Sequence, residues 1–144
     1  MPVIEHTIFI RAAPEAVFDL ISRVEDFSHY SWTIRSVRAL SPDTYRWTIG
    51  IAGFGLDWDS VVTAKERPTR FAWRSIRGIE NDGLFHLAPA DGGTEVRFIM
   101  KYRLPETILK KIVDTIAAPL MQRVATELLD AVRERLEHAR RHVN

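Results

Sequence analysis

"IRAAPEAVFDLISRVEDFSHY", residues 10–30, contains the change from strand to helix on which the fold depends. Pro14 is tolerated in the first turn of a helix, and the spacing that follows predicts a short helix ending near Ser22. Its apolar face consists of three residues: Val17, Phe18 and Ile21. The next segment, "VEDFSHYS", is too brief for more than a second short helix or a tight turn.

Both flanks of this stretch have the pattern of β-strands. Before it, residues 3–11 alternate with period two, which predicts one strand with Ile4, His6, Ile8 and Ile10 on a single face. After it, residues 34–104 form strand-like runs separated by short segments rich in Gly, Pro, Asp or Asn, among them "GIAGFG" and "RGIENDG". Short connections imply antiparallel pairing, so we expect about seven strands in a sheet that curls and has a concave side.

The C-terminal part of the chain returns to helical spacing. We expect Pro119 to kink or restart the helix, giving one helix over residues 106–117 and a long one over 119–141. One broad apolar stripe runs along the long helix: Leu120, Met121, Val124, Ala125, Leu128, Leu129, Val132 and Leu136. Such a stripe must be buried. If the helix lies across the concave side of the sheet, the apolar stripe and the concave face cover each other.

Size and composition limit the protein's class. The 144 residues predict a single domain over residues 1–144, and 46% hydrophobic with 27% charged residues is ordinary for a soluble globular protein. The net charge of +1 provides no field for a nucleic acid or an anionic membrane. The chain has no cysteine, which excludes thiol chemistry. It has no run that resembles a signal peptide or a membrane span, so we expect no stable membrane insertion and a cytoplasmic location.

The chain resembles the START-like helix-grip superfamily (SRPBCC), in particular its polyketide cyclase/dehydrase and lipid-transport branch, whose members include coenzyme Q-binding proteins. The resemblance runs nearly end to end and rests on residues 10–30 and on "FAWRSIRGIENDGLFHLAPADGGTEVRF", residues 71–98. It implies an α+β helix-grip fold: a seven-stranded curved antiparallel sheet wrapped around a long C-terminal helix, with two short helices between the first two strands. It does not imply one activity, because aromatases, hydrolases, lipid carriers and receptors share this scaffold.

Period-two spacing also predicts which side chains face the helix. Three tryptophans, Trp47, Trp58 and Trp73, should share the concave side, where they either fill a solid core or form the wall of a ligand cavity. We favour the cavity, and the other residues expected to line it come from the strands and the long helix: Ile49, Leu56, Phe85, Leu87, Met100, Tyr102, Met121, Val124 and Leu128.

Catalytic candidates are few. His6, Tyr45 and Tyr102 face inward by parity, although a packed or rim-exposed histidine is the commoner situation for His6. Asp57, Asp59, Arg74 and His86 should form a solvated charge pattern on the outer face. His138 and His142 have the spacing of a helical metal pair but lack an acidic third ligand, so we expect no metal and no cofactor.

"GIAGFG" is followed by a strand, whereas a phosphate-binding loop is followed by a helix, so we predict a hairpin turn there. We expect the protein to bind or transport a hydrophobic small molecule, such as a lipid, an isoprenoid or an aromatic polyketide-like compound. One alternative is a cyclase/aromatase-type enzyme that catalyses aldol cyclisation and dehydration in the same cavity. The other is a stress-related or regulatory interaction domain with an unknown protein partner, and the sequence does not decide whether the protein is an enzyme.

Overall fold

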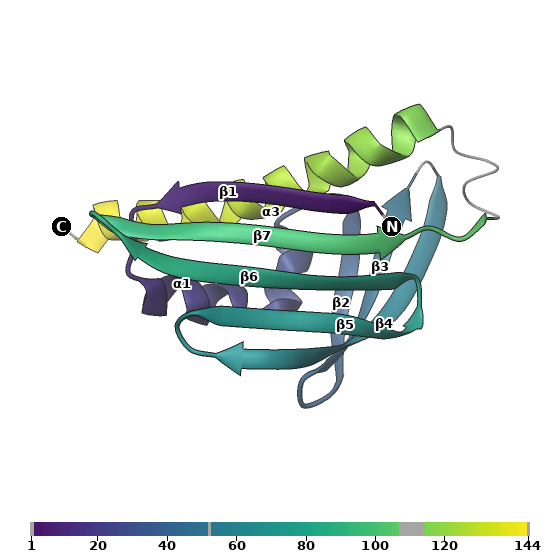
Figure 1. Ribbon diagram of the computed structural model, residues 1–144, viewed down its shortest axis with the longest axis horizontal. Coiled ribbons are helices and arrows are strands. Elements are labelled where there is room, and N and C mark those ends of the chain that lie inside the picture. Colours follow the sequence, from purple (N-terminus) through teal and green to yellow (C-terminus); the bar gives the residue numbers. More distant parts are fainter. Residues whose placement is uncertain (1, 52, 107–113, 144) are drawn as a thin grey trace.

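The computed structural model describes residues 2–51, 53–106 and 114–143, and in it a curved antiparallel sheet wraps around a long helix (Figure 1). The elements follow the predicted order. They are β1 (Val3–Ile10), α1 (Pro14–Ile21), the 3₁₀ helix η1 (Val24–His29), β2 (Ile34–Ser41), β3 (Thr44–Ile51), β4 (Phe54–Glu66), β5 (Arg70–Gly78), β6 (Glu80–Ala90), β7 (Gly93–Arg103) and α3 (Asp114–Val143). The α+β helix-grip fold predicted from the sequence is confirmed.

The sheet has the order β1-β7-β6-β5-β4-β3-β2, and every neighbouring pair is antiparallel. Register shifts interrupt the pairing of β2 with β3 and of β4 with β5. Such bulges bend a strand and increase its twist, so they account for the strong curl of β2–β4 behind the rest of the sheet (Figure 1). This curl creates the concave side that the helices occupy.

The inner face of the sheet is covered by two helices. Helix α1 packs against β6 and β7, and α3 packs against β1 and α1. The apolar stripe predicted for α3 faces the core: Met121, Ala125, Leu128, Leu129 and Val132 are buried, and Leu120, Val124 and Leu136 pack against them. Burial of this stripe holds the helix against the sheet.

Two predicted boundaries were wrong. Helix α3 continues through Pro119 instead of dividing there, because a proline near the start of a long helix removes only one backbone hydrogen bond. Most of the shorter helix predicted over 106–117 lies outside the described residues. The connection predicted at "RGIENDG" is confined to Ile79, because β5 ends at Gly78 and β6 begins at Glu80. Gly78 makes this tight turn possible through its φ of 80°, a conformation that glycine adopts without strain.

The outer face of the sheet contains a buried carboxylate that the sequence did not predict. Asp59 pairs across β3–β4–β5 with Arg46 and Arg77, each of which reaches both carboxylate oxygens, at 2.8 to 3.2 Å. The Asp59 side chain is only 9% exposed, so the expectation of a solvated charge was wrong at this position. Hydrogen bonds from Arg46 and Arg77 hold the pKa of Asp59 well below its usual value.

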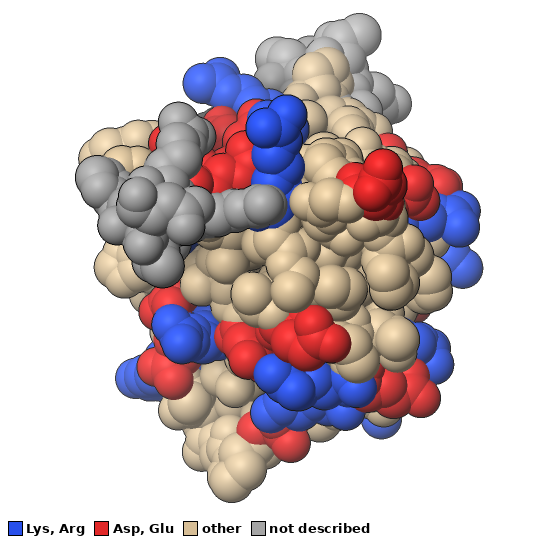
Figure 2. Space-filling model, turned by 90° about the vertical axis from the view of Figure 1, so that its left-hand side faces the viewer, with Lys and Arg blue, Asp and Glu red and all other residues tan. Residues whose placement is uncertain are grey.

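Elsewhere the surface charges are mixed. On the face shown in Figure 2, acidic and basic side chains alternate around an uncharged centre, and neither sign forms a continuous patch. This distribution agrees with the net charge of +1. Within the described part of the chain, no helix combines the length and apolar character that crossing a membrane requires.

Candidate functional site

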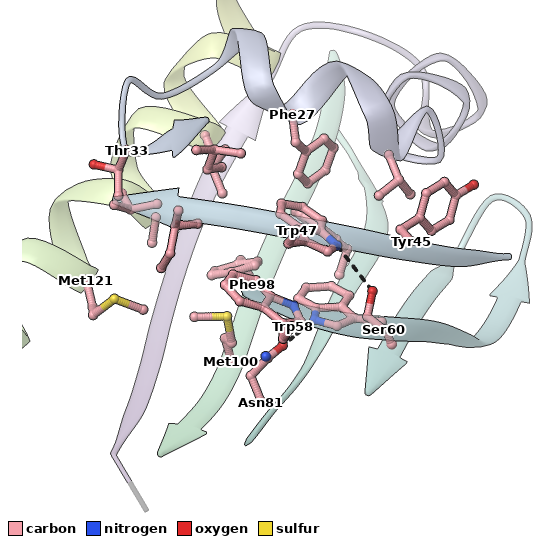
Figure 3. Close-up of a pocket in the computed structure, with 18 of the residues that line it drawn as sticks. Phe27, Thr33, Tyr45, Trp47, Trp58, Ser60, Asn81, Phe98, Met100 and Met121 are labelled. Atoms are coloured by element: carbon pink, nitrogen blue, oxygen red, sulfur yellow. Dashed lines mark hydrogen bonds between the residues drawn. The ribbon is translucent and has the colours of Figure 1, made fainter. Parts of the chain in front are cut away.

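A small cavity lies between the concave face of the sheet and helix α3 (Figure 3). Its volume is about 70 Å³. The described residues that line it come from η1, the turn that follows it, β2–β7 and α3: Val24, Phe27, Thr33, Ile34, Tyr45, Trp47, Ile49, Trp58, Ser60, Val62, Phe71, Trp73, Asn81, Phe85, Phe98, Met100, Met121, Val124, Ala125 and Leu128. The side chains therefore fill most of the space between sheet and helix but leave an apolar void.

Aromatic rings form much of the wall. Trp47 and Trp58 face each other across β3 and β4, and their rings stack at 5.6 Å with an interplanar angle of 8°. Trp73 lies on β5, stacked on Phe98 at 6.1 Å and tilted against Phe85 at 5.7 Å. The flat apolar face of such a ring can stack on another ring of the protein or on a flat apolar ligand.

Two of these tryptophans have hydrogen-bond partners inside the site. The Trp47 Nε1–H donates to Ser60 Oγ at 3.2 Å, and the Trp73 Nε1–H donates to Asn81 Oδ1 at 3.3 Å. The Asn81 side chain is held in turn, because its Nδ2 donates to the Ile79 carbonyl oxygen at 3.1 Å. Trp58 differs, because its Nε1 is buried and makes no hydrogen bond with any described group.

Among the described residues that line the cavity, none carries a charge at neutral pH. The only ionisable one is Tyr45, and burial, reinforced by Asp43 and Glu25, raises the pKa of its phenol above the usual value. Its hydroxyl points away from the Trp47 and Trp58 rings (Figure 3). The described lining can therefore hold a neutral apolar molecule, and none of its residues is a base at neutral pH.

Most of the cavity residues predicted from the sequence lie at this site. Those that line the cavity are Trp47, Ile49, Trp58, Trp73, Phe85, Met100, Met121, Val124 and Leu128. Leu56, Leu87 and Tyr102 do not, although all three are buried or pack against the core. Alternation along a strand predicts the face of a side chain but not its distance from the cavity. Each of the three is two residues along its strand from a residue that does line the cavity.

The predicted catalytic candidates are not brought together. His6 is on edge strand β1, where its Nε2 lies 2.6 Å from Oε1 of Gln122 on α3, and it does not line the cavity. Tyr102 is buried at the end of β7, and burial raises the pKa of its phenol. Of the three candidates, only Tyr45 contacts the cavity.

Several lining residues were absent from the set predicted for the cavity. Phe71, Phe98, Ser60 and Val62 have the inward parity of their strands and could have been included on that signal. Asn81 could not, because "ENDG" has the composition of a turn. In the structure it is a strand residue, and its backbone N–H donates to Ser75 Oγ at 3.0 Å.

Within the described residues, no group of three or more His, Asp or Glu side chains is arranged to hold a metal ion. His138 is exposed on α3, and the side chain of His142 lies outside the described residues. The predicted spacing of this pair therefore has no structural description.

Residues 1–137 match the family model described as polyketide cyclase / dehydrase and lipid transport. No protein with a curated description matches the chain in sequence. The match to the family model nevertheless covers almost the whole chain and includes every strand of the sheet and the cavity-lining part of α3.

Solved structures share the fold at low sequence identity. A protein from Thermus thermophilus is 23% identical, with a TM-score of 0.83 over 96% of this chain and 99% of that one. A START superfamily protein from Mycobacterium smegmatis is 16% identical, with a TM-score of 0.71 over 95% and 98%. The Zhui aromatase/cyclase from a Streptomyces species is 17% identical, with a TM-score of 0.73 over 99% and 96%. At these identities the likeness concerns the fold alone.

Proposed function

Because the chain belongs to the polyketide cyclase/dehydrase and lipid transport family, we propose that it binds or carries a neutral hydrophobic small molecule between the sheet and helix α3. The observation that carries this proposal is the uncharged aromatic lining of the cavity, in which Trp47, Trp58 and Trp73 converge. Lipids, isoprenoids and aromatic polyketide-like compounds all have the apolar surface that such a lining accepts.

The small volume of the cavity restricts how a ligand can enter it. A cavity of roughly 150 Å³ in another protein accepts benzene, whereas the one here measures about 70 Å³. A ligand therefore has to displace side chains when it enters. Met100 and Met121 line the cavity, and their unbranched thioethers change rotamer at little cost, so they are the side chains best suited to give way.

Cyclisation of a poly-β-keto chain, the alternative function, is less well supported by the lining. An aldol step needs a base to remove a proton next to a carbonyl, and among the described lining residues only Tyr45 can titrate. The raised pKa of Tyr45 keeps its phenol protonated at neutral pH, so it cannot serve as that base. Binding requires no such group.

The proposal can be tested by filling the cavity. Ala125 is buried, lines the cavity and lies on α3, and Ala125→Leu adds roughly the volume of the void. We expect the variant to keep or gain stability in urea unfolding while it loses saturable binding of indane, a flat bicyclic hydrocarbon. Binding would be followed by the fluorescence of the three cavity tryptophans in a Trp32→Phe background, because Trp32 is 99% exposed.

Ala131→Leu is the matched control, because Ala131 is on the same helix but does not line the cavity. It should bind indane as the parent protein does. The proposal is wrong if the parent protein binds no indane, or if Ala125→Leu binds it unchanged. In a cavity too small to accept these atoms, Ala125→Leu would instead cost about 1 to 3 kcal/mol through overpacking.

A further inference from the structure

The Trp58 indole has a hydrogen-bond donor with no acceptor in the described protein. Its Nε1 is buried, unlike that of an exposed tryptophan, which water would satisfy. The ring stacks on Trp47 with nearly parallel planes, so the N–H, which lies in the plane of its own ring, does not point at the Trp47 face. A buried donor without an acceptor is costly, and natural proteins rarely keep one without a reason.

The other two tryptophans show how this fold normally satisfies an indole. Trp47 and Trp73 lie on the neighbouring strands β3 and β5, and each has a polar side chain within reach, Ser60 and Asn81 respectively. Trp58 lies between them on β4 and lines the same cavity, but no such side chain is placed for it in the described part of the chain. What distinguishes Trp58 is therefore the missing acceptor, since its position and burial are similar.

We infer that the ligand supplies this acceptor: a neutral oxygen, such as a ketone, quinone or ether oxygen, on an otherwise apolar and flat molecule, which accepts the hydrogen bond of Trp58 Nε1–H. This inference rests on the proposed function and narrows its ligand class. A carboxylate or phosphate does not fit, because the described lining has no cation to balance its charge. A pure hydrocarbon would fit the cavity but would leave the donor unsatisfied.

The test compares two ligands of nearly the same shape, indane and 1-indanone, in which a carbonyl replaces one methylene. Their dissociation constants would be measured for the parent protein and for Trp58→Phe. The substitution removes the donor and keeps an aromatic ring, so the affinity for 1-indanone should fall about tenfold relative to the affinity for indane. The ratio of the two dissociation constants is not affected by a change in cavity size, because such a change alters the affinity of both ligands alike.

Trp73→Phe is the matched control. It removes an indole N–H that Asn81 already accepts, and the amide oxygen that it frees cannot donate to a ketone. The ratio of the two affinities should therefore stay as in the parent protein. If Trp58→Phe also leaves this ratio unchanged while both ligands bind, the inference is wrong and the proposed function stands. If neither ligand binds saturably, both fail.

The indole signals in a ¹H–¹⁵N correlation spectrum give a second measurement that does not depend on affinity. The chain has four tryptophans, and the Trp→Phe variants assign their Nε1–H resonances. Saturation with 1-indanone should move the Trp58 proton downfield, as a new hydrogen bond does, whereas saturation with indane should not. Equal shifts with both ligands would overturn the inference.

Discussion

Asp59 organises the outer face of the sheet, because its carboxylate joins three neighbouring strands. Arg46 on β3 and Arg77 on β5 each donate two hydrogen bonds to it. Bidentate pairs of this kind fix the relative positions of the strands as well as contributing energy. They lie directly behind the part of the sheet whose inner face presents Trp47 and Trp58 to the cavity.

Asp59 should give the protein a specific dependence of stability on pH. The unfolded chain protonates this carboxyl near its ordinary pKa of 3.8, and the folded protein does so only at a lower pH. The contribution is therefore complete well above pH 3.8 and is lost as the pH falls toward the lowered value. We expect Asp59→Asn to be markedly less stable than the parent protein at pH 7 and this difference to shrink below about pH 4.

Urea unfolding at pH 3, 4, 5 and 7 measures this difference. Asp57→Asn is the control, since that side chain is half-exposed and its ion pair with Arg77, at 3.4 Å, is longer than those of Asp59. It should lose less stability at pH 7. A difference between Asp59→Asn and the parent protein that stays constant from pH 7 to pH 3 would contradict the assigned role of the two arginine pairs.

Gly83 allows Trp73 to lie flat across the neighbouring strand. The two residues are paired in β5 and β6, and a Cβ added at Gly83 would overlap the Trp73 ring. Gly83→Ala should therefore cost about 1 to 3 kcal/mol of unfolding free energy through overpacking. In Gly55→Ala the nearest described atom to the added Cβ is Nη1 of Arg35, at 3.5 Å, so this control should be neutral or slightly stabilising. Equal stability of the two variants in urea would show that the ring does not lie against Gly83.

The chemistry of single residues was only partly predictable from the sequence. The three cavity tryptophans could be placed, because alternation along a strand determines the face of each side chain. Asn81 and Asp59 could not. Asn81 stands in a segment with the composition of a turn, and the burial of Asp59 depends on the register that places arginines on both neighbouring strands. The pairing of β4 with β5 shifts register between Asp59 and Ser60, and alternation along one strand does not specify such a shift.

At the scale of elements, helix α3 closes the site. Leu128 is buried on the stripe that faces the sheet and also lines the cavity. Leu128→Glu would place an unpaired charge there, so we expect a loss of about 3 kcal/mol or more in unfolding free energy. Thr126→Glu puts the same charge on the exposed face of the helix and should change stability by about 0.5 kcal/mol at most. If both variants melt at the temperature of the parent protein, the helix is not docked through this stripe.

Element types were predictable from the sequence to a greater degree than their ends. The strands and the long helix have long periodic patterns, and the structure has each of them. The predicted restart of the helix at Pro119 was wrong, because tertiary burial of the stripe outweighs the loss of one hydrogen bond and α3 continues through that residue. Leu56, Leu87 and Tyr102 have inward parity, yet the extent of the cavity depends on where α1 and α3 cross the sheet, which parity does not specify.

For the whole molecule, the small cavity makes binding dependent on motion. The described residues leave about 70 Å³, so a ligand the size of indane enters only after side chains, or α3 itself, have moved away from the sheet. The binding energy available to the ligand must exceed the cost of that opening. The observed affinity is then the affinity of the open state multiplied by the small fraction of molecules that are open.

This dependence predicts the form of the binding kinetics. If opening precedes entry, the observed rate of tryptophan quenching by indane should rise with ligand concentration and then level off at the opening rate. Met121→Ala shortens a flexible lining side chain on α3, so it should raise the plateau, tighten binding and lower the unfolding free energy by about 2 kcal/mol or more. Stopped-flow fluorescence in the Trp32→Phe background measures the observed quenching rate at each indane concentration, for the parent protein and for Met121→Ala. A rate that rises linearly to the highest concentration, equally in both proteins, would mean that the cavity is already open to a ligand of this size.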